Sequence, residues 1–106
     1  MEYARIDTFT NGWFIGDFHP SILRTGAFEV CFKELRAGFS EPMALQIHCE
    51  EVTLVISGRI RMGDLIFAAG DVVRVMPGEP VDLTVLEDSR LIGIKTPSLP
   101  GDKRTL

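Results

Sequence analysis

Residues 38–58 read GFSEPMALQIHCEEVTLVISG, a segment that begins and ends on glycine. Inside it Gln46, His48 and Glu51 fall within six positions, immediately before the apolar run VTLVI. A short apolar run bounded by a turn residue is typical of a buried strand. The polar cluster is therefore placed to hold a metal, to catalyse a reaction, to bind a ligand without a metal, or only to complete a core.

Turn signals divide the rest of the chain into short segments. They occur at NG (11–12), TG (25–26), SG (57–58), GD (63–64), AGD (69–71), PGEP (77–80) and EDS (87–89). The segments between them are rich in Val, Ile, Leu, Phe and Thr, and no amphipathic helix of three turns is visible. This pattern predicts an all-β sandwich or barrel. The one helical turn that the sequence predicts is PSILRTG (20–26).

Two segments indicate which faces their strands present. FEVCFK (28–33) alternates as a half-buried strand does, with Phe28, Val30 and Phe32 on its apolar side. EVTLVIS (51–57) is apolar on both sides, which predicts a central strand covered on both faces, by the opposite sheet and by a second subunit. We therefore expect a homodimer.

Composition and charge exclude several kinds of partner. The chain has 106 residues, a net charge of −4 and no basic cluster longer than a dipeptide, so we expect no nucleic-acid partner. No apolar run approaches the roughly 20 residues that cross a bilayer, and the first residues lack a signal-peptide pattern. These features predict a cytoplasmic protein without a membrane partner. Cys31 and Cys49 have no C-x-x-C partner and are expected to be buried thiols.

The glycine spacing resembles that of the cupin family. Gly38, Glu51 and Gly58 match the first cupin motif, G-x5-H-x-H-x4-E-x6-G. Gly70 and the turn at Pro77 and Gly78 in GDVVRVMPGEPV resemble the second motif, G-x5-P-x-G-x2-H-x3-N. The resemblance implies an all-β double-stranded β-helix, the jelly-roll barrel that cupins share.

The resemblance also implies how the chain is organised. It covers residues 28–96, which would form the barrel core. Residues 1–27 would add N-terminal strands, and 97–106 would be an extended C-terminal tail lying over the surface. We therefore expect residues 1–106 to form a single cupin domain.

The positions that hold a divalent metal in cupins depart from the family pattern. The two histidines of the first motif fall on Ala44 and Gln46, its glutamate on Glu51, and the histidine of the second motif on Val81. Alanine and valine offer no donor, and a carboxamide oxygen is a weak ligand for transition metals. We therefore predict no metal and no cofactor. The asparagine that ends the second motif is replaced by Val85.

A ligand site in the barrel lumen is the main functional prediction. Its polar groups would be Gln46, His48, Glu51, Thr53 and Arg61. His48 keeps the strand parity of Ala44 and Gln46, so it is predicted to face the lumen, and Arg61 would be a pocket cation for an anion.

Three functions remain open on these residues. The first is metal-independent binding of a small polar molecule, a sugar or a carboxylate. The second is a metal-free isomerase, epimerase or lyase with Glu51 and His48 as catalytic base and acid. The third is a structural or regulatory homodimer.

Overall fold

The computed structural model describes residues 1–106, which form an almost entirely β structure with two short 3₁₀ turns near the N-terminus. The all-β prediction is therefore confirmed. The 3₁₀ turns are η1 (Ile6–Thr8) and η2 (Thr10–Gly12). The strands are β1 (Trp13–Ile15), β2 (Glu29–Leu35), β3 (Ser40–Gln46), β4 (Glu50–Met62), β5 (Leu65–Ala68), β6 (Val72–Val75), β7 (Val81–Thr96) and β8 (Lys103–Thr105).

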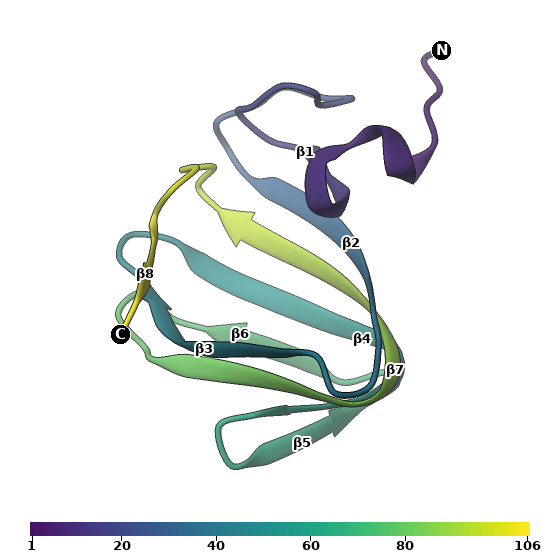
Figure 1. Ribbon diagram of the computed structural model, residues 1–106. Coiled ribbons are helices and arrows are strands. Elements are labelled where there is room, and N and C mark those ends of the chain that lie inside the picture. Colours follow the sequence, from purple (N-terminus) through teal and green to yellow (C-terminus); the bar gives the residue numbers. More distant parts are fainter.

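The long strand β7 organises the sheet. One of its edges pairs with β3 through residues 81–84 and then with β2 through residues 89–95. Its other edge pairs with β4 along nearly its whole length, and β4 in turn pairs with β5 and β6. Because β7 bends between the β3 and β2 ladders, the single sheet folds over into two facing layers that converge at one end (Figure 1).

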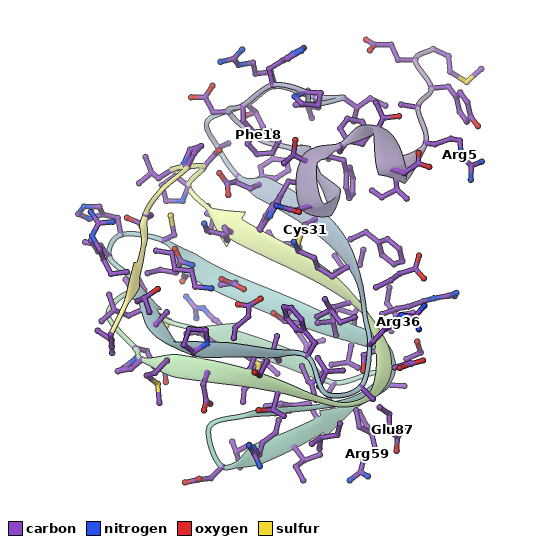
Figure 2. The ribbon with its side chains drawn as sticks, viewed as in Figure 1. Arg5, Phe18, Cys31, Arg36, Arg59 and Glu87 are labelled. Carbon is purple, nitrogen blue, oxygen red and sulfur yellow. The ribbon has the colours of Figure 1, made fainter.

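The convergent end holds the apolar core. Val55, Ile60, Val85 and Leu91 are buried there, and partly buried side chains from β2, β4, β5 and β7 pack around them. Outside this end Arg59 and Glu87 form an exposed ion pair of 3.6 Å (Figure 2). The opposite end, where the layers diverge, is left for the site described below.

Gly58, the last glycine of the first motif, lies where β4 bends against β7. The register between the two strands shifts on both sides of it, and its φ is +88°. A Cβ at this position would overlap the Asp88 carbonyl and the Ser89 side chain. Only glycine allows both this backbone conformation and this approach of the two strands.

One predicted feature differs in the structure. Residues 20–26 do not form a helical turn, because the N–H groups of Ile22 and Gly16 donate to the carbonyls of Phe14 and Leu23 in a pairing with β1. The C-terminal segment is extended, and its strand β8 pairs with β3. Within the single chain, Leu54 and Ile56 on the outward side of residues 51–57 are exposed. No helix has the length and apolar character to cross a membrane.

We expect Gly58→Ala to lower the free energy of unfolding by about 3 kcal/mol, because the methyl group displaces β7 backbone and the residue keeps a positive φ. Gly63→Ala is the matched control: its φ is also positive, at +58°, but nothing lies within 4 Å of its Cβ position. It should cost only about 1 kcal/mol. Urea unfolding followed by tryptophan fluorescence measures both, and equal losses would show that the approach of the strands contributes nothing.

Candidate functional site

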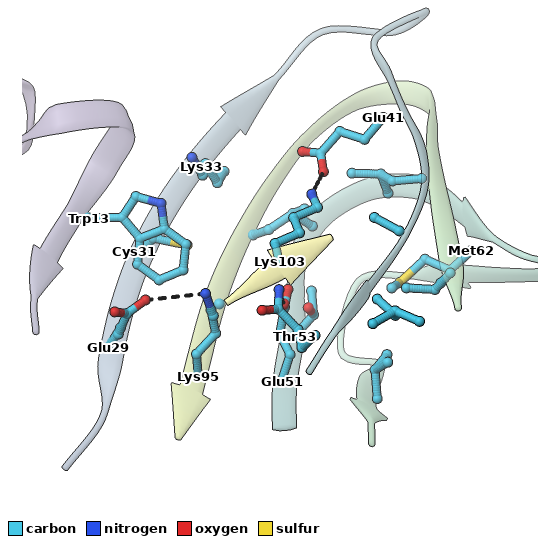
Figure 3. A pocket seen from close by; sticks show the side chains of 18 of the residues that line it. Trp13, Glu29, Cys31, Lys33, Glu41, Glu51, Thr53, Met62, Lys95 and Lys103 are labelled. Carbon is cyan, nitrogen blue, oxygen red and sulfur yellow. Dashed lines mark hydrogen bonds and ion pairs between the residues drawn. The ribbon is translucent and has the colours of Figure 1, made fainter. Parts of the chain in front are cut away.

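A cavity of about 560 Å³ opens between the two layers of the sheet (Figure 3). Its walls come from the inward-facing residues of β2, β3, β4 and β7, with Trp13 of β1 and Lys103 of β8 at its sides. The volume falls within the roughly 300–1,000 Å³ that is usual for small-molecule sites.

The four motif positions converge on this cavity. Ala44 and Val81 are cross-strand partners of β3 and β7, and both line the cavity together with Gln46 and Glu51. Of these four side chains, only Gln46 and Glu51 carry an atom that could coordinate a metal. Gln46 Nε2 already donates a hydrogen bond to Glu51 Oε2 at 3.3 Å. One amide and one carboxylate do not fit a divalent transition metal. No group of three or more histidine, cysteine, aspartate or glutamate side chains is arranged to hold one.

Three of the five predicted ligand-binding residues line the cavity. Glu51 and Thr53 alternate inward along β4, and Gln46 ends β3 with its side chain buried. The alternation of β4, counted from the motif glutamate, predicted that these side chains face inward, and it holds at these positions.

His48 is placed outside the cavity, so the predicted pair with Glu51 does not form. Strand β3 ends at Gln46, and the bend that follows breaks the alternation on which the prediction relied. The His48 backbone N–H donates to the Asp102 carboxylate, with N–O distances of 2.9 and 3.1 Å, and its side chain is exposed. Burial acts to raise the pKa of Asp102, but the N–H donors of Cys49 and His48 hold it below its ordinary value.

Arg61 also lies outside the cavity. Its neighbours Ile60 and Met62 take the inward positions of β4, which leaves Arg61 on the exposed side. Its guanidinium donates to Thr84 Oγ1 at 3.3 Å. Arg61 is therefore not a cation of the pocket, contrary to the prediction.

Buried charge in the cavity comes instead from a pair that the sequence analysis did not select. Glu29 of β2 and Lys95 of β7 are cross-strand partners, with Oε1 and Nζ 3.5 Å apart. Both side chains are almost completely buried, at 4% and 10% exposure, and Ser98 donates to Glu29 Oε2 at 2.8 Å. Such a pair is tolerated in a barrel because each charge has a partner.

Two more lysines border the cavity. Lys103 of β8 pairs with Glu41 at 2.8 Å, and Lys33 donates to the Asn11 carbonyl at 2.6 Å. The ammonium groups of Lys33 and Lys95 each lie 5.6 Å from the centre of the Trp13 ring, within range of a cation–π interaction. In the sequence Trp13, Lys95 and Lys103 are separated from the motif by tens of positions, and the polar side of FEVCFK was the only signal for Lys33.

Burial sets the protonation of the groups at the base of the cavity. It raises the pKa of Glu51, against the opposing effect of Lys95 and Lys103. It also raises the pKa of the Cys31 thiol to about 11, which keeps that sulfur protonated and weakly nucleophilic. Gln46 lines the cavity, and its buried Oε1 atom has no hydrogen-bond partner.

Comparison with known proteins identifies the fold. No protein-family model and no curated protein sequence matches the chain. Among solved structures, a Klebsiella pneumoniae protein with a double-stranded β-helix domain aligns over 79% of this chain and 74% of its own, at 20% identity and a TM-score of 0.70. The DMSP lyase DddQ from Ruegeria pomeroyi aligns over 88% of this chain and 49% of its own, at 15% identity and a TM-score of 0.72.

A third neighbour is the nucleoside dehydratase Pac13 from Streptomyces. It aligns over 77% of this chain and 70% of its own, at 14% identity and a TM-score of 0.69. Identities this low establish the fold alone. The fold that the predicted resemblance implies is confirmed: the chain has a double-stranded β-helix fold.

Proposed function

We propose that the chain binds a small, neutral, hydroxyl-bearing molecule, such as a sugar, in its cavity and does so without a metal. The observation that carries this proposal is the buried acceptor Gln46 Oε1, which has no donor. Leaving a buried acceptor unpaired costs about 1–3 kcal/mol, and a ligand hydroxyl group that Oε1 meets when the Gln46 amide turns toward the cavity would recover that energy. The adjacent Glu51 offers further oxygen atoms for hydrogen bonds.

The charges favour a sugar over a carboxylate, the two classes that the sequence left open. Lys95 and Lys103 are already paired with Glu29 and Glu41. The cavity lining contains five carboxylates against three ammonium groups: Glu29, Glu41, Glu51, Glu79 and Asp82 against Lys33, Lys95 and Lys103. An anionic ligand would enter a lining with an excess of negative charge and would compete for ammonium groups that have partners.

Trp13 gives the cavity a flat apolar wall beside these polar groups. Ligand sites commonly combine such an aromatic surface with a few polar groups that fix orientation. A pyranose or furanose ring has the matching character, with apolar C–H faces and a polar edge. Trp13 is also the only tryptophan of the chain, so its fluorescence reports on the cavity alone.

We expect at least one sugar in a panel of neutral pentoses and hexoses to change Trp13 fluorescence saturably. Gln46→Leu, which keeps the side-chain volume but removes the acceptor, should weaken that binding about tenfold, the equivalent of about 1.4 kcal/mol. Arg61→Gln is the control and should leave the dissociation constant unchanged, since Arg61 lies outside the cavity. Saturation by the matching sugar acids and not by the sugars would contradict the proposal.

The raised pKa of Glu51 gives a second test. Protonated Glu51 contributes its full stabilisation of the folded chain at pH values below the ordinary pKa of a glutamate. This stabilisation is lost as the pH rises through the raised pKa that Glu51 has in the folded chain. Glu51→Gln removes that loss, so we expect the variant to gain stability relative to the wild type between acid and neutral pH. Urea unfolding over a pH series measures this gain, and parallel curves for the two proteins would contradict it.

A metal-free acid–base enzyme is the second candidate. Glu51 and Lys95 are cross-strand partners that both line the cavity, so they take the place of the predicted pair of Glu51 and His48. Burial raises the pKa of Glu51, so this carboxyl group holds its proton to higher pH than an ordinary glutamate, as a general acid or base requires. The fold neighbours include a lyase and a nucleoside dehydratase, which is compatible with such chemistry on this scaffold.

Exchange of carbon-bound hydrogen separates the two candidates. For an enzyme, we expect NMR in D₂O containing EDTA to show loss of a C–H signal from a sugar that binds, with the wild type and not with Glu51→Gln. A sugar that binds but retains all its C–H signals would leave binding as the function of the cavity.

A further inference from the structure

Lys95 lies in the middle of a row of charged side chains that crosses three strands of the cavity wall. The register pairs it with Glu29 of β2 on one side and with Glu51 of β4 on the other. All three side chains line the cavity, and Figure 3 shows Lys95 between the two carboxyl groups. Side chains that face each other across neighbouring strands have Cβ atoms about 4.5–5.5 Å apart, so these three groups are close enough to contact one ligand.

The ammonium group of Lys95 has hydrogen-bonding capacity that Glu29 does not use. Its nitrogen is 3.5 Å from Glu29 Oε1, which is longer than the roughly 2.7–2.9 Å of a charge-assisted hydrogen bond. Glu29 instead accepts a hydrogen bond of 2.8 Å from Ser98 at its other oxygen atom. The ammonium group has three N–H donors, yet the Lys95 side chain is only 10% exposed. Acceptors for these donors therefore have to come from what occupies the cavity.

Gly93 keeps space open beside this ammonium group. It precedes Lys95 by two positions on β7, so it lies on the same inward side, between Cys31 and Thr53. Its φ is not positive, so its backbone conformation does not require glycine. A glycine inside a strand weakens that strand and often marks a place where another group approaches closely. Here a Cβ would lie 2.8 Å from Cys31 Sγ, and a side chain would narrow the cavity next to Lys95.

Glu51 connects Lys95 with the unpaired acceptor of Gln46. Glu51 Oε2 accepts a hydrogen bond from Gln46 Nε2 at 3.3 Å, while the backbone register pairs Glu51 with Lys95. Burial raises the pKa of Glu51, and the Lys95 ammonium is close enough to oppose that rise. The cavity therefore has an unpaired acceptor, Gln46 Oε1, and an underused donor, Lys95 Nζ, next to the same carboxyl group.

We propose that Gln46, Glu51 and Lys95 select a vicinal diol, two hydroxyl groups on neighbouring carbon atoms of the ligand. One hydroxyl group donates to Gln46 Oε1, the other accepts from Lys95 Nζ, and Glu51 bonds to either of them. A hydroxyl group can take both parts, because it has one donor and two acceptor lone pairs. This inference rests on the function proposed above and narrows it, since an isolated hydroxyl group would satisfy only one end of the arrangement.

Sugars that lack one hydroxyl group at a time test the diol. D-ribose, D-glucose and D-galactose are each compared with their monodeoxy derivatives by titration of Trp13 fluorescence in the wild-type chain. For a sugar that binds, we expect loss of either of two adjacent hydroxyl groups to raise the dissociation constant about tenfold, the equivalent of about 1.4 kcal/mol. Loss of any other hydroxyl group should change the dissociation constant by less than about twofold.

A pair of variants then assigns one of the two hydroxyl groups to Lys95. Lys95→Met removes the donors, and it is made together with Glu29→Gln so that no buried carboxylate loses its cation. With Glu29→Gln alone, we expect the roughly tenfold difference between the sugar and its deoxy derivative to persist. Adding Lys95→Met should reduce this difference to about one for the hydroxyl group that accepts from Lys95. Circular dichroism and thermal unfolding establish that both variants are folded; if the double variant does not fold, the deoxy series on the wild type decides.

Three results would overturn this inference and leave the proposed function intact. One is a sugar that binds but tolerates the loss of each single hydroxyl group. Another is a pair of sensitive hydroxyl groups that are not adjacent. The third is a difference between sugar and deoxy sugar that survives in the folded chain with Lys95→Met. If none of the neutral sugars binds, the proposed function is contradicted and this inference fails with it.

Discussion

The close approach of Gly58 to Asp88 and Ser89 is the constraint on which the rest of the structure depends. At this point β4 and β7 bend together, and the shift in their register allows one sheet to become two facing layers. The convergent end then buries the core around Val55 and Ile60, and the divergent end is left open as a cavity. The two regions adjoin, because Ile60 and Leu91 belong to the core and also line the cavity, whereas Val55 and Val85 belong to the core alone.

The cavity combines open space with polar side chains that have unused hydrogen-bonding capacity. Ala44 and Val81 leave space, whereas Gln46 and Glu51 leave hydrogen-bonding capacity that the chain does not fully use. Glu29 and Lys95 compensate each other across neighbouring strands. Half of the charged groups that line the cavity form ion pairs with one another, while one neutral acceptor has no partner, and this combination supports the proposed hydroxyl-bearing ligand over an anion.

The same alternation that makes the cavity polar makes the opposite side of the sheet apolar. Inward Glu29 is followed by outward Val30, and inward Lys95 is preceded by outward Ile94, because successive residues of a strand point to opposite faces. A polar inner face and an apolar outer face are thus one property of β2 and β7.

By itself the sequence determined the β class, the turns, the position of Gly58 and the inward parity of Gln46, Glu51 and Thr53, because these depend on local spacing. It predicted His48 in the lumen wrongly, since parity fails where β3 ends. Only the tertiary structure brought Glu29 and Lys95 together, because strand pairing joins residues far apart in the chain. It also decided which side of FEVCFK faces inward, since alternation defines two sides of a strand and the curl of the sheet selects one.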